Sequence, residues 1–164
     1  MTTLDVVKAK IQTKESIIHF LNAMKFFNRK VVFTNGVFDL MHLGHVDYLS
    51  KAKDCGQILV VGMNSDASVK MLNKGNTRPL QDQTSRSMVL ASLHFVDYVI
   101  IFDEETPYEL IKTIQPDVLV KGADYKVEQI VGHDIVLARG GEVKLIELVQ
   151  GYSTTAIEKK IKGS

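Results

Sequence analysis

Two histidines, His42 and His45, stand three residues apart with Gly44 between them, shortly after the apolar run 31–34. If a helix begins near residue 43, the two imidazoles share one face of its first turn. A helix N-terminus offers free N–H donors and partial positive charge, and a glycine lets a phosphate approach the backbone. The pattern predicts a phosphate site in which both imidazoles stabilise developing negative charge and neither is a nucleophile.

The protonation state of the two histidines stays open at this point. A helix N-terminus lowers the pKa of a histidine, whereas a bound polyphosphate raises it. Two turn histidines beside a glycine can also be a coincidence, but the preceding strand argues against this. A zinc site needs further Cys or His ligands, and no such cluster accompanies the pair, so no metal site is predicted.

Further cations are expected on the segment between two predicted helices. Lys74 and Arg78 belong to a basic connection there, and such a loop can close over a polyphosphate and exclude water; an ordinary solvated loop is the alternative. Arg86 opens the following helix, where a cation is disfavoured, so we expect an anion beside it. The alternative for Arg86 is a plain surface position.

Three hydroxyl residues in succession, Ser153, Thr154 and Thr155, follow Gly151 and Tyr152 and precede the closing helical pattern. Ser153 or Thr154 can cap that helix. Capping needs one hydroxyl, so three in succession favour a phosphate site.

The surrounding sequence alternates between strand and helix patterns. Short β-branched runs predict strands at 31–34, 58–62, 98–102, 118–120 and 143–146, and helical patterns fall at 43–54, 66–73, 84–94, 106–115, 126–139 and 153–162. Continuous apolar strands suit burial on both faces, and the alternation predicts an α/β sandwich with a parallel sheet. Strands then lead into polar residues at Asn35, Asn64 and Lys121, which we expect at one rim, where open α/β sheets bind ligands.

Composition limits the class of protein. The chain has 164 residues, 45% hydrophobic residues, a net charge of +1 and one cysteine, which favours one domain over 1–164 without a disulfide framework. Helices within 1–27 are expected to pack on it. Near-neutral charge does not indicate nucleic-acid binding, and no apolar run reaches the roughly 20 residues of a membrane span. With no signal-peptide pattern, a cytoplasmic protein is expected.

These motifs resemble the cytidylyltransferase-like branch of the HxGH nucleotidyltransferases, which carries GxFDxxHxGH after its first strand and G-x-S-T-T near its end. Gly36 to His45 and Gly151 to Thr155 match the two signatures. The chain is most similar to the adenylyltransferases of ADP-heptose synthesis, through the segments 34–39, 64–69, 77–79, 96–104 and 116–125.

The resemblance implies a Rossmann-like three-layer sandwich of about five parallel strands in the order 3-2-1-4-5. It implies AMP transfer from ATP, carried with Mg²⁺, to D-glycero-D-manno-heptose 1-phosphate by direct in-line attack. His42, His45, Lys74 and Arg78 would be catalytic. The expected nucleotide contacts are Asn35, Gly36, Val37, Phe38, Gly44, Lys121, Gly122, Asp124, Tyr152, Ser153, Thr154 and Thr155. The expected sugar-phosphate contacts are Asp39, Asn64, Asp66 and Arg86.

Two departures from the family pattern affect these expectations. Glycerol-phosphate cytidylyltransferases carry an arginine shortly before the G-x-S-T-T segment, where this chain has 147–150, Glu-Leu-Val-Gln. That weakens the alternative of CTP with glycerol 3-phosphate; a nucleotide-binding module without turnover is the other alternative. The kinase half of the bifunctional relatives is absent, so a separate heptose kinase is expected, together with a homodimer and a product used for lipopolysaccharide.

Overall fold

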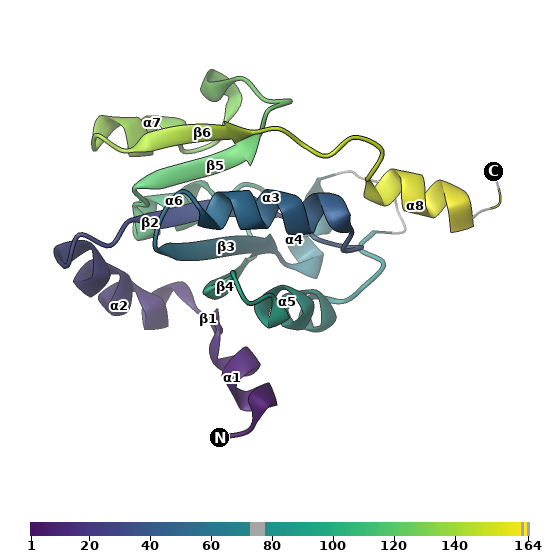
Figure 1. Cartoon of the computed structure of the whole chain (residues 1–164), viewed down its shortest axis with the longest axis horizontal. Helices are drawn as coiled ribbons and strands as arrows, with labels where there is room; N and C mark the ends of the chain where they lie inside the picture. The colour runs from purple at the N-terminus through teal and green to yellow at the C-terminus, as the bar shows by residue number, and fades with distance from the viewer. Residues whose placement is uncertain (73–77, 162, 164) are drawn as a thin grey trace.

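A six-stranded parallel sheet forms the centre of the computed structural model, which describes residues 1–72, 78–161 and 163 (Figure 1). The strands are β1 (Ile11–Gln12), β2 (Val31–Gly36), β3 (Ile58–Asn64), β4 (Tyr98–Phe102), β5 (Val118–Gly122) and β6 (Glu142–Ile146). Their order is β1-β4-β3-β2-β5-β6, and every pairing is parallel. The five predicted strands therefore occur in the predicted order, and β1 is an addition at the β4 edge.

Helices cover both faces of the sheet, which confirms the three-layer sandwich. One face carries α1 (Thr3–Ala9), α3 (Leu43–Lys53) and α5 (Gln83–Ser92), and the other carries α2 (Lys14–Phe26), α6 (Tyr108–Ile114) and α7 (His133–Ala138). The remaining elements are α4 (Asp66–Met71), the 3-10 helix η1 (Val127–Gln129) and α8 (Thr154–Ile161).

The central strands explain why two cores form. Along β2, Val32 belongs to the α3–α5 core, whereas Val31 and Phe33 belong to the α2–α6 core. All three side chains are fully buried. Successive side chains of a strand point to opposite faces, so a continuous apolar run fills both layers.

The N-terminal segment contains the expected helices, α1 and α2, but the short strand β1 lies between them. Ile11 pairs with Val99, and the ammonium of Lys10 donates to the carbonyls of Leu93 and Val96. Two strand residues are too few to produce a periodic signal in the sequence, which is why β1 was missed.

Within the described ranges, we find no helix with both the length and the apolar character needed to cross a lipid bilayer.

Candidate active site

A cleft of about 570 Å³ opens at the carboxyl ends of the strands. It is lined by residues from the loops after β2, β3, β4, β5 and β6 and from the first turn of α3. The structure brings together in this cleft many of the residues predicted for the site: Asn35, Gly36, Val37, Phe38, His42, Gly44, His45, Asn64, Lys121, Gly122, Asp124, Tyr152, Ser153 and Thr154. The three polar segments expected at one rim thus share one cavity.

The two histidines stand at the start of α3, as the spacing predicts. His42 is the N-cap residue, with extended backbone and no capping hydrogen bond from its side chain. The two rings stack with centroids 3.9 Å apart and an interplanar angle of 29°. Both Nδ1 atoms are buried and have no hydrogen-bond partner among the described residues. A buried polar atom without a partner is costly, so these atoms mark a place that a polar ligand would satisfy.

Burial disfavours the protonated form of both imidazoles in the ligand-free protein. It lowers the pKa of His45 to about 4, with a smaller contribution from the neighbouring His42. Burial also lowers the pKa of His42. A neutral imidazole donates one hydrogen bond through the nitrogen that carries its proton and can accept another at the second nitrogen.

Gly44 makes the histidine stack sterically feasible. A methyl group at this position would lie 3.1 Å from Cε1 and Nδ1 of His42 and 3.5 Å from Cβ of Tyr152. The His42 ring therefore occupies the space that a side chain at position 44 would need. A phosphate that approaches the backbone there would need the same space.

The ring of Phe38 packs beside the ring of His45. Its ring centroid lies 5.4 Å from that of His45, and its φ of +51° is uncommon for a residue with a bulky side chain. Left-handed backbone at such a residue costs about 1–2 kcal/mol, and it persists where the surrounding packing fixes it. Here Phe38 is buried and belongs to the α3–α5 core.

Tyr48 forms the floor of the cleft. Its hydroxyl shares a 2.7 Å hydrogen bond with Thr34 Oγ1 and donates to the carbonyl of Val120 at 3.1 Å. These contacts tie α3 to β2 and β5 directly below the site. Burial raises the pKa of Tyr48, so the hydroxyl stays protonated and serves as a donor.

Lys121 and Asn35 lie next to each other in the lining of the cleft. The Lys121 ammonium lies 3.4 Å from the Asn35 carbonyl oxygen and 5.6 Å from the ring centroid of Tyr125. The side-chain oxygen of Asn35 is buried and has no hydrogen-bond partner in the part of the chain described.

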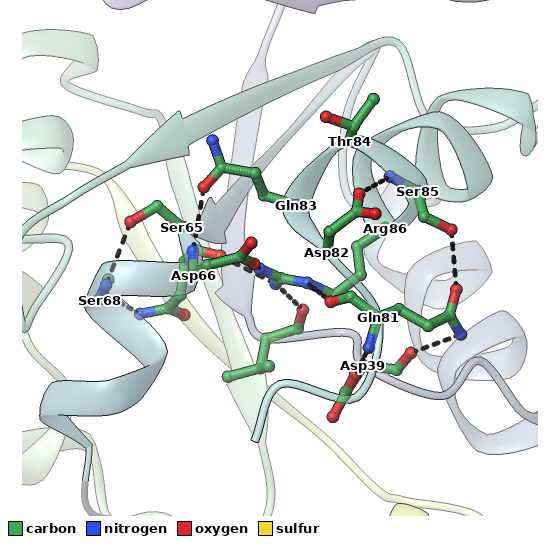
Figure 2. Close-up of polar contacts among 12 residues, drawn as sticks. Asp39, Ser65, Asp66, Ser68, Gln81, Asp82, Gln83, Thr84, Ser85 and Arg86 are labelled. Atoms are coloured by element: carbon green, nitrogen blue, oxygen red, sulfur yellow. Dashed lines mark hydrogen bonds and ion pairs between the residues drawn. The ribbon is translucent and has the colours of Figure 1, made fainter. Parts of the chain in front are cut away.

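Arg86 occupies a different setting from the one expected of a substrate ligand. Its guanidinium is fully buried and donates to the carbonyls of Val37, Asn64 and Gln81 at 2.7, 2.8 and 3.0 Å. The expected anion is present, but it is Asp66 of the same chain, at 2.7 Å (Figure 2). Arg86 therefore joins the ends of β2 and β3 to the start of α5, outside the cleft.

Four further predicted residues also lie outside the cleft. Asp39 is buried and accepts hydrogen bonds from the backbone N–H groups of Leu80 and Gln81. Asp66, Arg78 and Thr155 do not line the cavity either. Lys74 lies outside the described residues.

The hydroxyl segment before α8 caps the helix and also lines the cleft. Ser153 Oγ accepts from the backbone N–H of Ala156 at 3.1 Å, which is the capping role. Ser153 and Thr154 also line the cleft. One hydroxyl thus caps the helix while the segment remains part of the cavity wall.

Comparison with known proteins identifies the family. The family model described as cytidylyltransferase-like matches residues 33–160. The chain belongs to the cytidylyltransferase-like family. This confirms the predicted class of enzyme, a nucleotidyltransferase.

Curated relatives of this cytidylyltransferase-like chain include proteins named bifunctional protein HldE. The one from Wolinella succinogenes is 55% identical over 155 residues, which are 94% of this chain and 32% of the relative. The one from Campylobacter concisus is 60% identical over 134 residues, 82% of this chain and 27% of the relative. The chain therefore spans about a third of the length of these relatives.

Solved structures show the same architecture. A lipopolysaccharide core biosynthesis protein from Thermoplasma volcanium has a TM-score of 0.61 and 29% identity, covering 76% of this chain and 99% of its own. A pantoate-beta-alanine ligase from Francisella tularensis has a TM-score of 0.60 at 17% identity, covering 93% of this chain and 76% of its own. The second likeness shows the fold alone.

Eleven residues that line the cleft were not predicted from the sequence. The additional lining residues are Tyr48, Leu72, Glu105, Thr106, Pro107, Tyr125, Gln129, Ile130, Val131, Leu148 and Val149. Residues 105–107 follow β4 and residues 148–149 follow β6, so the rule that ligands bind at the carboxyl ends of strands would have found both groups in this cytidylyltransferase-like fold. Ile130 and Val131 carry no such signal, because they look like ordinary core residues.

Proposed function

We propose that the chain is an adenylyltransferase that transfers AMP from ATP to D-glycero-D-manno-heptose 1-phosphate, giving ADP-heptose and pyrophosphate. The single observation that carries this proposal is the cleft in which the first turn of α3, Lys121 and Ser153–Thr154 line one cavity. The choice of a heptose phosphate is supported by relatives named HldE at 51–60% identity. The assignment of ATP in place of CTP rests on the family resemblance.

In the proposed reaction, a phosphate oxygen of the sugar 1-phosphate attacks the α-phosphorus of ATP. The bond between the α-phosphorus and the bridging oxygen breaks, and its electron pair leaves with pyrophosphate. A sugar phosphate is already ionised at neutral pH, so no general base is required. Catalysis then consists of alignment and charge stabilisation.

His42 and His45 are proposed to donate hydrogen bonds to the phosphate oxygens as negative charge develops. Their location at the N-terminus of α3 supports this, because the free N–H groups there also favour anions. Asn35 and the segment 121–124 are proposed to contact the nucleoside. The direct roles assigned to Lys74 and Arg78 on the triphosphate, and to Asp39, Asn64, Asp66 and Arg86 on the sugar phosphate, stay predictions.

Mg²⁺ is proposed to arrive with ATP and to neutralise part of the triphosphate charge. Among the side chains that the structure describes, no group of three or more His, Cys, Asp or Glu residues could hold a metal ion. The homodimer and the separate heptose kinase also stay predictions.

The test is a pyrophosphate-release assay with ATP, CTP and GTP, each paired with heptose 1-phosphate, hexose 1-phosphates and glycerol 3-phosphate. We expect release with ATP and heptose 1-phosphate, and mass spectrometry should identify ADP-heptose. Release with CTP and glycerol phosphate, but not with the first pair, would overturn the proposal in favour of a cytidylyltransferase. Nucleotide binding without release in any pair would indicate a binding module.

A further inference from the structure

The closing helix α8 lies at the surface of the fold. It projects beyond the end of the sheet after the extended connection that follows β6 (Figure 1). None of its residues is buried. Yet its first residue, Thr154, lines the cleft together with Tyr152 and Ser153. A wall of the cleft thus begins on a helix that has no fully buried residue.

An ion pair provides an attachment for α8. Arg78 Nη2 lies 2.8 Å from Glu158 Oε2, and the two side chains are only 14% and 21% exposed. A partly buried pair at hydrogen-bond distance is stronger than the exposed pairs that contribute little to stability. Glu158 is four residues after Thr154, so the two share one face of α8.

Arg78 is in turn anchored to the loop that precedes the histidines. Its Nη1 lies 3.8 Å from Asp39 Oδ2. The Asp39 carboxylate is itself fixed, because it accepts from the backbone N–H groups of Leu80 and Gln81. Gln81 closes the connection by donating from its side-chain amide to the Asp39 carbonyl at 2.9 Å.

The chain of charges therefore runs from Asp39, three residues before His42, through Arg78 to Glu158 on α8. It joins the two sides of the cleft that carry the histidine stack and the hydroxyl segment. We propose that Glu158 is a positioning residue, which acts through Arg78 to hold Ser153 and Thr154 in the wall of the nucleotide cleft. The consequence of this inference rests on the proposed function. The inference gives Arg78 a bridging role between two carboxylates, which is an alternative to the direct contact with the triphosphate predicted from the sequence.

This role predicts a particular kinetic signature. Glu158 touches no reacting atom, so Glu158→Gln should raise the KM and the Kd for ATP roughly fivefold and leave kcat within about twofold. Amide hydrogen exchange in α8 should accelerate, because loss of the pair releases the helix. A merely structural defect would instead lower the fraction of active protein and reduce kcat.

A double-mutant cycle tests whether Glu158 acts through Arg78. Arg78→Gln and Glu158→Gln should each raise the ATP Kd by a similar factor, and the double variant should be no weaker than Arg78→Gln alone. The matched control is Glu142→Gln, which makes the same chemical change at the opposite end of β6. Glu142 has exposed ion pairs with Lys30 and Lys144 at 3.8 and 3.4 Å, so its loss should change neither the Kd nor exchange in α8.

Calorimetric ATP binding and hydrogen exchange require no sugar acceptor, so they separate this inference from the proposed function. Wild-type protein that binds ATP but releases no pyrophosphate would overturn the function and leave the cycle measurable. Glu158→Gln with wild-type Kd and wild-type α8 exchange would overturn the positioning role. The positioning role would also be overturned if the two substitutions raised the ATP Kd multiplicatively in the double variant. The same holds if Arg78→Gln lowered kcat far more than Glu158→Gln does. Failure of the wild type to bind ATP would overturn both.

Discussion

His42 and His45 stack at 3.9 Å between ring centroids, so the two imidazoles form one unit at the start of α3. Protonation of both rings at this distance would place two positive charges face to face in a partly buried setting. The neighbouring ring indeed contributes to the low pKa of His45. The pair is therefore prepared for an anion that balances the charge, and the following consequences can be measured.

Replacing His45 by alanine should lower turnover by about 10²-fold or more, because a preorganised donor to the developing charge is lost. The fold should survive, since Phe38 and Tyr48 still close the core around the position. Pyrophosphate release and thermal unfolding measure the two effects. The exposed His94 gives a control, His94→Ala, which should keep wild-type turnover. Normal turnover of His45→Ala would show that the phosphate role is wrong.

Binding of ATP should be coupled to proton uptake. The folded protein holds the pKa of His45 at about 4, so this ring is neutral near pH 6, and a bound polyphosphate should raise it. Titration calorimetry in buffers of different ionisation enthalpy measures the protons taken up. We expect a positive value near pH 6 that diminishes in His45→Ala. Equal apparent enthalpies in all buffers would contradict the prediction.

Stability of the ligand-free protein should decrease in acid partly because of His45. An unfolded histidine binds its proton near pH 6.5, whereas the folded pKa is about 4, so the unfolded state binds more protons between these values. The contribution of the neutral ring is present above about pH 6.5 and is lost as the pH falls toward 4, with a slope of up to about 1.4 kcal/mol per pH unit for one proton. Urea unfolding at several pH values should show a steeper decline for the wild type than for His45→Gln.

Gly44→Ala should impair catalysis without weakening the fold. The added methyl group would lie 3.1 Å from the His42 ring, so the ring must shift by a few tenths of an ångström. Misplacement of a positioned donor should lower kcat by about tenfold or more. Alanine is favoured over glycine inside a helix by up to about 1 kcal/mol, so the melting temperature should not fall. An unchanged kcat would show that the stack tolerates the methyl group.

Arg86→Met should destabilise the protein by about 3–5 kcal/mol, because it leaves buried partners without their cation and donor. The carbonyls of Val37 and Asn64 and the carboxylate of Asp66 lose their hydrogen bonds together. Urea unfolding measures the change in stability. The stability of Arg86→Lys should fall between those of the wild type and Arg86→Met, because lysine keeps the charge but has fewer donors. Unchanged stability with a raised KM for the sugar phosphate would instead support the substrate contact expected from sequence.

The sequence was sufficient to predict the central strands β2, β3 and β5 because they are buried on both faces. Runs such as 58–62 and 118–120 are apolar without alternation, so the strand positions followed from the pattern. The strand order came from the family resemblance. The edge strand β1 has no such signal. The 126–139 pattern was predicted as one helix, but Gly132 has a φ of +82° and separates η1 from α7.

The candidate site was predictable where function depends on the local sequence, and less so where it depends on tertiary contacts. His42, Gly44 and His45 act through spacing on one helix, which can be counted. Arg86 gave a correct signal, a cation that needs an anion, but Asp66 lies 20 residues away and its proximity depends on the packed sheet. The contact between Arg78 and Glu158 had no local signal at all, because it joins the connection before α5 to the last helix.

The edge strand β1 also constrains how the chain assembles during synthesis. Lys10 and its acceptor Val96 are 86 residues apart, so the N-terminal strand has no partner until most of the sheet has left the ribosome. At typical rates of synthesis this delay is about 4–17 s. During that interval the β4 edge that β1 will cover does not yet exist, so β1 has no strand to pair with. The N-terminal strand β1 is therefore among the last elements that the native sheet can incorporate.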